Sequence, residues 1–311
     1  MTPAHEVDIS WQVLRRIVKE WAGESAELAE VRPLVGGCVN TTVGLQTKDG
    51  QQAVLKICAH RVNHAFAHEA FQLELLRKIG LPVPQVYVWR IGSLDDPFSY
   101  LLMQYMDGVM LAEARQSCGP EGFDHLQEHL AELVLAMHEQ TADGFGRVRS
   151  DAPRHDRWLH FFREIYDPLL HDVEKSGLLP PKCRKHLHRI HERLDRVLTH
   201  ADAPRLVHGD LWATNLLAKQ NGDGRWHISG MLDPNCKYAH AEMELAYLEL
   251  FHTANTAFFK AYAKRHKLPP EYHHFRKSLY QLYSLVNHVH LFGQDYVKAL
   301  TAAVERVSAV V

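Results

Sequence analysis

The sequence has little cysteine and no long apolar run. Its 311 residues include five cysteines, an odd number, and none of them forms a Cys-x-x-Cys pair. A disulfide framework is therefore not expected, whereas a reducing cytoplasmic compartment is. No stretch of about 18 apolar residues occurs, so no membrane span is expected. The first residues also lack the basic and apolar regions of a secretory signal.

An excess of charge of either sign is missing as well. Thirty-five Lys and Arg stand against 37 Asp and Glu, which gives a formal net charge of −2. Nucleic acid and membranes are therefore not expected as partners. The apolar fraction of 46% excludes a mostly disordered chain. The length predicts two domains or one large bilobal unit. A monomer or a homodimer is expected.

The residue pattern changes near residue 105. Residues 9–22 have helical spacing of apolar residues, and strand patterns then alternate with turns up to residue 105, interrupted by one helix at 62–79. This predicts an α+β fold that begins with a five-stranded antiparallel sheet and one helix (residues 1–105). The remainder, 106–311, is predicted to be a helical lobe with a small β-island at 205–234. Its expected helices are 122–140, 156–175, 182–200, 240–266, 271–291 and 293–309.

The β-island carries the strongest chemical signal. A His-Gly-Asp tripeptide at residues 208–210 is followed by Asn215, and an apolar strand then ends at Asp233. Phosphoryl transfer from a nucleotide needs a carboxylate that orients the attacking hydroxyl and oxygen ligands for Mg²⁺. The Asp-x-x-x-x-Asn spacing followed by a strand-end Asp is typical of kinases. The alternative is a loop whose Asp and Asn side chains only cap turns.

Further upstream, the sequence contains the other half of a nucleotide site. Lys56 ends the segment Ala-Val-Leu-Lys, which matches the Val-Ala-Ile-Lys strand of kinases, and Glu69 follows 13 residues later in the predicted helix. In that arrangement the lysine reaches the α/β-phosphates and the glutamate holds it. Glu74 is a rival partner for Lys56. Both residues could also be solvated surface groups.

A glycine turn lies between the first strands. Gly36, Gly37 and Cys38 could place backbone N–H groups over phosphates, although the turn is not a Gly-x-Gly-x-x-Gly motif. An ordinary hairpin turn is the alternative.

Together these motifs resemble the fructosamine (ketosamine) kinases, a family within the protein-kinase-like aminoglycoside/choline phosphotransferase superfamily. The resemblance covers about residues 31–297 and includes the glycine turn, the loop from Leu206 to Asn215 with a tryptophan after Asp-Leu, and Leu-Asp-Pro at 232–234. It departs at Glu244, where that family usually has aspartate. Between Phe145 and Trp158 the chain also lacks sequence motifs that are typical of fructosamine kinases.

The resemblance implies a bilobal kinase fold, ATP and Mg²⁺ as cofactors, and a role for each motif. Asp210 would orient the acceptor hydroxyl, and Asn215 and Asp233 would bind Mg²⁺. Lys56, held by Glu69, would contact the α/β-phosphates. The nucleotide would also contact the glycine turn at Gly36, Gly37 and Cys38 and, through the backbone, a hinge at Gln104, Tyr105 and Met106.

The acceptor is less defined than the nucleotide chemistry. The resemblance favours a hydroxyl of a fructosamine or ribulosamine, and Trp212 could stack on its sugar ring or simply anchor the loop by packing. Aminoglycosides, choline and homoserine are alternatives on the same fold. A nucleotide-binding pseudokinase is an alternative of another class. Pro234 stands where protein kinases have Phe, so a protein-kinase activation loop is not evident, and a small-molecule substrate is expected.

Overall fold

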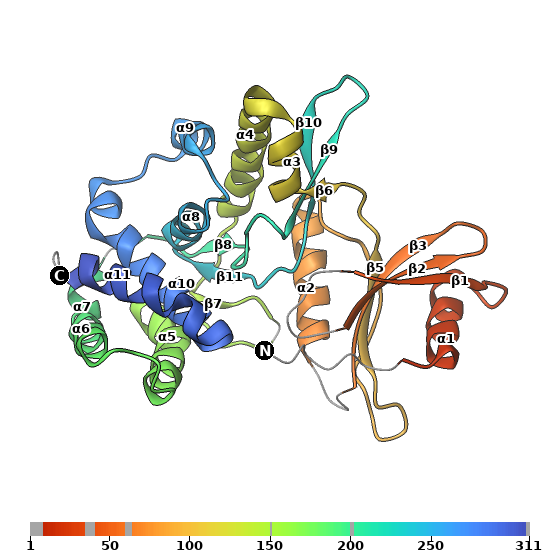
Figure 1. Ribbon diagram of the computed structural model, residues 1–311, viewed down its shortest axis with the longest axis horizontal. Coiled ribbons are helices and arrows are strands. Elements are labelled where there is room, and N and C mark those ends of the chain that lie inside the picture. The colour runs from red at the N-terminus through yellow and green to blue at the C-terminus, as the bar shows by residue number, and fades with distance from the viewer. Residues whose placement is uncertain (1–8, 35–40, 60–63, 150, 200–201, 309–311) are drawn as a thin grey trace. The chain divides into compact units, whose positions relative to one another are not determined.

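The structure is a computed structural model that describes residues 9–34, 41–59, 64–149, 151–199 and 202–308 (Figure 1). The chain divides into two compact units. The first consists of Met1–Ser117 and Thr214–Pro234, and the second of Cys118–Ala213 and Asn235–Val311. This division differs from the predicted boundary after residue 105, because a segment up to Ser117 and a hairpin of the β-island group with the first unit.

A five-stranded antiparallel sheet forms the larger part of the first unit, as predicted. Its strand order is β1-β2-β3-β5-β4, and every neighbouring pair is antiparallel. The strands are β1 (Leu28–Pro33), β2 (Thr41–Thr47), β3 (Gln52–Cys58), β4 (Val86–Arg90) and β5 (Ser99–Gln104). The single predicted helix is α2 (Ala65–Lys78), and the N-terminal helix is α1 (Trp11–Ala22).

The two helices lie on opposite sides of this sheet (Figure 1). Leu14, Ile17 and Val18 of α1 pack in one buried cluster with alternate residues of β3, among them Leu55 and Ile57. Successive side chains of a strand point to opposite faces. Lys56, between Leu55 and Ile57, therefore points to the face that α2 covers.

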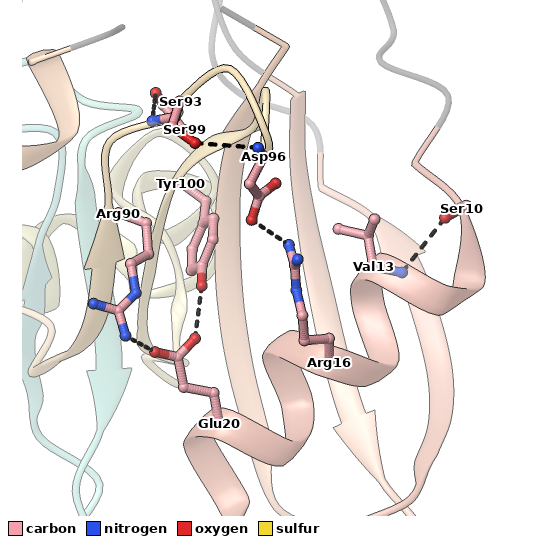
Figure 2. Close-up of polar contacts among 10 residues, drawn as sticks. Ser10, Val13, Arg16, Glu20, Arg90, Ser93, Asp96, Ser99 and Tyr100 are labelled. Carbon is pink, nitrogen blue, oxygen red and sulfur yellow. Dashed lines mark hydrogen bonds and ion pairs between the residues drawn. The ribbon is translucent and has the colours of Figure 1, made fainter. Parts of the chain in front are cut away.

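Polar contacts fix α1 to the sheet edge (Figure 2). Tyr100 on β5 donates a hydrogen bond of 2.7 Å to the Glu20 carboxylate, which also pairs with Arg90 on β4. Arg16 pairs with Asp96 at 2.6 Å. At the start of the helix, the Ser10 hydroxyl accepts from the N–H of Val13, which satisfies one of the backbone donors that a helix leaves unpaired.

A smaller sheet completes the first unit. It has the order β10-β9-β6 and consists of β6 (Val109–Met110), β9 (Leu216–Gln220) and β10 (Trp226–Met231), and the short helix α3 (Leu111–Ser117) follows β6. The β9–β10 hairpin belongs to the predicted β-island. The two-residue strand β6 and helix α3 were not predicted.

The second unit is mostly helical, as predicted, around a small sheet of order β7-β11-β8. The strands are β7 (Gly146–Arg147), β8 (Arg205–Val207) and β11 (Lys237–Ala239). The helices are α4 (Gly119–His138), α5 (Trp158–Lys175), α6 (Pro181–Glu192), α7 (Leu194–Val197), α8 (Ala241–Leu250), α9 (Thr256–Arg265), α10 (Lys277–Phe292) and α11 (Val297–Ser308), with a π-helical turn at Tyr272–Arg276 and a 3₁₀ turn at Gly293–Tyr296. Within the described ranges, no helix is both long enough and apolar enough to cross a bilayer.

The prediction of one long helix over 240–266 is wrong. The chain instead forms α8 and α9, because His252 adopts a left-handed conformation with φ of 53°. Asn255 then begins α9 by accepting from the N–H groups of Ala257 and Phe258 at 2.8 and 3.2 Å. Short polar residues at this position stabilise a helix start and compete with continuation of the preceding helix.

Candidate functional site

Lys56 is the centre of a charged cluster in the first unit. Its side chain leaves β3 on the side of α2, and its Nζ lies 2.7 Å from the Oε1 atom of Glu69. The same Nζ forms an ion pair with Asp233, which follows β10. The lysine is 8% exposed, so both carboxylates compensate a buried charge. The predicted pairing of Lys56 with Glu69 is present, and the rival Glu74 is not its partner.

The charge on this lysine is stabilised by its neighbours. Burial alone lowers the pKa of the Lys56 ammonium, but the carboxylates of Glu69 and Asp233 outweigh burial and raise that pKa above its ordinary value. Lys56 is therefore a permanent cation near neutral pH, held in one position by residues from two elements.

Asn215 and Asp233 meet at the ends of the β9–β10 hairpin. The backbone N–H of Leu232 donates to the Asn215 carbonyl oxygen at 2.8 Å, which brings the two strand ends side by side. Asp233 has φ of 53°, a left-handed conformation that few non-glycine residues adopt. Such strain is frequent at functional positions. Among the described residues, no group of three or more His, Cys, Asp and Glu side chains could hold a metal by itself.

The predicted hinge begins where β5 ends. Gln104 exchanges hydrogen bonds with Gln85, since its N–H donates to the Gln85 carbonyl at 2.8 Å and its Oε1 accepts from the Gln85 N–H at 3.2 Å. The ring of Tyr105 lies 4.9 Å from the Arg32 guanidinium. Met106 is partly buried. The predicted phosphate turn at Gly36, Gly37 and Cys38 lies outside the described residues.

Asp210 belongs to the second unit, in the loop that follows β8. The N–H groups of His208 and Gly209 both donate to the Glu244 carboxylate, at 3.1 and 2.8 Å. Gly209 has φ of 78°, and a Cβ atom there would lie only 2.2 Å from the Asn235 carbonyl oxygen. Only glycine fits at this point of the loop, which explains the Gly of the His-Gly-Asp tripeptide.

Glu244, noted in the sequence only as a departure from the family's usual aspartate, is a positioning group. It is 3% exposed on α8, and besides the two backbone donors it contacts the Nε2 atom of His138 at 3.2 Å. Burial opposes ionisation of this carboxyl, but the hydrogen bond and charge of His138 lower its pKa below the ordinary value. An ionised Glu244 thus fixes the backbone of the loop that presents Asp210.

Tyr247 is a direct partner of the Asp210 carboxylate. One helical turn beyond Met243 on α8, its hydroxyl donates to Oδ1 of Asp210 at 2.7 Å. Burial raises the pKa of Tyr247, and the charge of Asp210 raises it further, so the hydroxyl stays protonated and remains a donor. The donor fixes the direction in which Asp210 points.

A cavity of about 310 Å³ opens beside Asp210 within the second unit. Its wall combines apolar residues of α5 and α10 with polar groups, among them Asp210, Tyr247 and Glu164. This mixture and size are typical of small-molecule sites. Trp212, predicted as a stacking platform, is 38% exposed and does not belong to the described lining of this cavity.

Two cations, Lys237 and Arg147, also line the cavity, and neither was predicted as a site residue. They lie directly opposite each other on β11 and β7. The only available signal was a lysine inside the short apolar segment Cys-Lys-Tyr-Ala.

Comparisons with known proteins show the family of the chain. The model of a family described as fructosamine kinase matches residues 10–309. A "Probable ketoamine kinase" of Lactiplantibacillus plantarum is 27% identical over 288 residues, which are 91% of this chain and 97% of the relative. The "Probable ketoamine kinase YniA" of Escherichia coli K12 is 28% identical over 311 residues, with 96% and 99% covered.

Solved structures share the fold. A candidate fructosamine-3-kinase from Thermobifida fusca superposes with a TM-score of 0.76 at 24% identity, covering 96% of this chain and 99% of that one. A thermostable mutant of the aminoglycoside phosphotransferase APH(4)-Ia, in a ternary complex with ADP and hygromycin B, gives a TM-score of 0.69 at 17% identity, with 96% of this chain and 98% of that one covered. The fold is that of kinase-like phosphotransferases.

Proposed function

The chain belongs to the fructosamine kinase family, and from this premise we propose that it transfers the γ-phosphoryl group of ATP to a hydroxyl of a ketosamine, with Mg²⁺. The observation that carries the proposal is the Asp210 carboxylate, which is oriented by Tyr247 at 2.7 Å and lines a cavity of small-molecule size. The names of the relatives, ketoamine kinases of about 28% identity, support the acceptor class.

Asp210 orients the acceptor in this proposal. Its carboxylate accepts a hydrogen bond from the attacking hydroxyl and receives the proton as the bond to phosphorus forms. The new bond joins the acceptor oxygen to the γ-phosphorus, the bond from that phosphorus to the bridging oxygen breaks, and ADP leaves. Glu244 holds the backbone of the loop, so that Asp210 needs little rearrangement during the reaction.

Lys56 serves the nucleotide. Its ammonium would contact the α- and β-phosphates, and the ion pair with Glu69 holds it in position. The family pattern assigns phosphate binding to residues 36–38, which lie outside the described residues, and adenine recognition to the backbone of residues 104–106. These assignments follow the family pattern onto the matching positions of this chain.

The oxygens of Asn215 and Asp233 fit Mg²⁺, which prefers one or two protein oxygen ligands together with waters and substrate phosphates. A cage of three or more acidic or histidine ligands is therefore not needed, and the described residues contain none. Bound there, the metal supplies charge neutralisation on the β- and γ-phosphates.

The charged groups of the cavity wall are mixed: Lys237 and Arg147 stand beside Glu164, Asp210 and Glu244. An aminoglycoside carries several positive charges, some of which would face the two cations. Like charges brought together in a partly buried site are unfavourable. A ketosamine carries one amine and many hydroxyls, which suits the mixed lining better.

The test is ATP consumption with a panel of ketosamines, aminoglycosides, choline and homoserine. We expect acceptor-dependent turnover with a ketosamine, reduced about 10²–10⁴-fold in Asp210→Asn. Asp223→Asn, in the exposed β9–β10 turn, is the matched control and should retain full activity. Turnover only with another acceptor would refute the ketosamine assignment, and equal turnover in Asp210→Asn would refute the role of Asp210.

A further inference from the structure

Two cations face the cavity from neighbouring strands. Lys237 on β11 is directly opposite Arg147 on β7, and Val207 on β8 lies opposite Lys237 on its other side. Directly opposite residues present their side chains on the same face of a sheet, and all three line the cavity. Like charges in this position destabilise a sheet. The pair therefore needs a compensating anion.

The protein compensates one of these cations but not the other. The Nε atom of Arg147 lies 3.8 Å from the carboxylate of Glu164, which also contacts His155 at 2.6 Å. Lys237 is 3% exposed, and its Nζ donates to the carbonyl oxygen of Asn235 at 2.7 Å, a neutral partner. Across the described part of the chain, no carboxylate lies within ion-pair distance of this Nζ.

The electrostatics of Lys237 agree with its geometry. Burial and the charge of Arg147 lower the pKa of Lys237 to about 8, against the opposite influence of Cys236, Asp210 and Glu244. The stabilising influence of Asp210 and Glu244 on this ammonium is therefore smaller than the opposing influence of burial and Arg147. An anion delivered by a ligand would balance it.

We propose that Lys237, with Arg147 beside it, binds a carboxylate of the acceptor, and that the preferred acceptor is the ketosamine of a free α-amino acid. This inference rests on the proposed function and adds the chemical class of the amine half of the substrate. It distinguishes a free amino-acid adduct from the same sugar attached to a lysine side chain of a protein, where no carboxylate lies near the sugar.

The position of Lys237 limits how far the carboxylate can be from the reacting hydroxyl. A Cβ atom on Gly209 would lie 2.8 Å from Nζ, so the ammonium packs against the residue that precedes Asp210. In an α-amino-acid adduct the carboxylate is attached to the carbon bonded to nitrogen, only a few bonds from the sugar hydroxyls. The cavity volume of about 310 Å³ also favours a compact acceptor.

The experiment compares two nearly isosteric acceptors, the 1-deoxyfructose adducts of glycine and of glycinamide. We expect kcat/KM of the wild-type protein to be about tenfold higher or more for the glycine adduct, as a charge-assisted hydrogen bond predicts. In Lys237→Met the ratio should fall to within about twofold of unity. Arg147→Gln should reduce the ratio partly. It also provides a second readout if Lys237→Met does not fold.

A control variant and a third acceptor complete the design. Lys182→Met removes an exposed lysine of α6 that pairs with Glu305, and it should leave the ratio unchanged. A 6-phosphorylated fructosamine of methylamine tests whether the anion belongs to the sugar. A preference for that compound that disappears in Lys237→Met would overturn the amino-acid assignment.

Two failures are distinguishable. Phosphorylation of both glycine-derived adducts at equal rates by the wild-type protein would overturn this inference and leave the proposed function intact. Absence of phosphorylation of any ketosamine would overturn the proposed function.

Discussion

Lys56 in the first unit and Lys237 in the second are both buried lysines, yet their surroundings are opposite. Lys56 is 8% exposed and contacts two carboxylates, while Lys237 is 3% exposed and contacts a neutral carbonyl oxygen. The pKa of Lys56 is raised because Glu69 and Asp233 outweigh burial, and the pKa of Lys237 is lowered to about 8 because burial and Arg147 prevail.

This contrast indicates which kind of partner each lysine has in the protein and which kind it would gain from a ligand. The ammonium of Lys56 already has its protein partners, so it can be held rigidly until phosphates arrive. The ammonium of Lys237 has no charged partner within ion-pair distance in the described residues, so a ligand anion has more to offer it. A buried charge is stable only with a partner, and the source of that partner distinguishes the two sites.

A third buried cation provides the largest expected effect on stability. Arg276 pairs with Glu242 through two hydrogen bonds of 2.5 and 2.6 Å, and both side chains are at most 7% exposed. Arg276→Met removes the charged partner of the buried Glu242 carboxylate and should lower the free energy of unfolding by about 3–5 kcal/mol. Chemical denaturation measures this. The exposed pair of Arg265 and Glu139 is the control, since Arg265→Met should cost less than about 1 kcal/mol.

Equal losses of stability in both arginine variants would show that burial does not determine how much a charged partner contributes to stability. The comparison of Lys56 with Lys237 assumes that it does, so this result would contradict that comparison.

Lys56→Met should have the next largest effect, on activity. Removing a fixed cation from the phosphates should reduce kcat about 10²–10³-fold with every acceptor, because the lost interaction concerns the nucleotide. Steady-state kinetics with a carboxylate-bearing and a neutral ketosamine measure it. A loss confined to one acceptor would show that Lys56 does not serve the nucleotide.

Lys237→Met should change stability less than Arg276→Met does, and in the opposite direction. The folded pKa of about 8 lies below the ordinary value of 10.5, so the folded state binds the proton of Lys237 more weakly than the unfolded state does. The resulting penalty is fully present below pH 8 and disappears as the pH rises from about 8 to 10.5. The variant should therefore be more stable than the wild type below pH 8, by up to about 3 kcal/mol.

Denaturation of both proteins between pH 7 and 10.5 measures this difference, which should shrink as the pH rises. A difference that is independent of pH, or a less stable variant at pH 7, would mean that the ammonium is compensated within the protein.

The five-stranded sheet and its chemistry could be predicted because local patterns determine them. The compact apolar segment that matches the Val-Ala-Ile-Lys strand located β3, and the two-sided geometry of a strand directs Lys56 toward the helix that bears Glu69. Asp210, Asn215 and Asp233 are close together in the sequence, so their spacing can be recognised without knowledge of the tertiary structure.

The acceptor cavity could not be predicted, for two physical reasons. Its wall is assembled from segments as distant as Arg147, Lys237 and Tyr283, and no local pattern records that they meet. The strands β7 and β11 have only two or three residues, too few for a periodicity. The predicted helix over 240–266 was wrong because the break depends on the single left-handed residue His252 and the cap at Asn255.

The central claim, that Asp210 directs phosphoryl transfer to a ketosamine, is tested most directly by detecting the product. Phosphorus NMR would follow wild-type protein and Asp210→Asn with ATP, Mg²⁺ and the glycine adduct of 1-deoxyfructose. We predict a new phosphate-monoester signal that grows with ADP in the wild type and is absent from Asp210→Asn over the same period. A signal of equal size in both proteins, or ADP formation without any phosphate ester, would contradict the account.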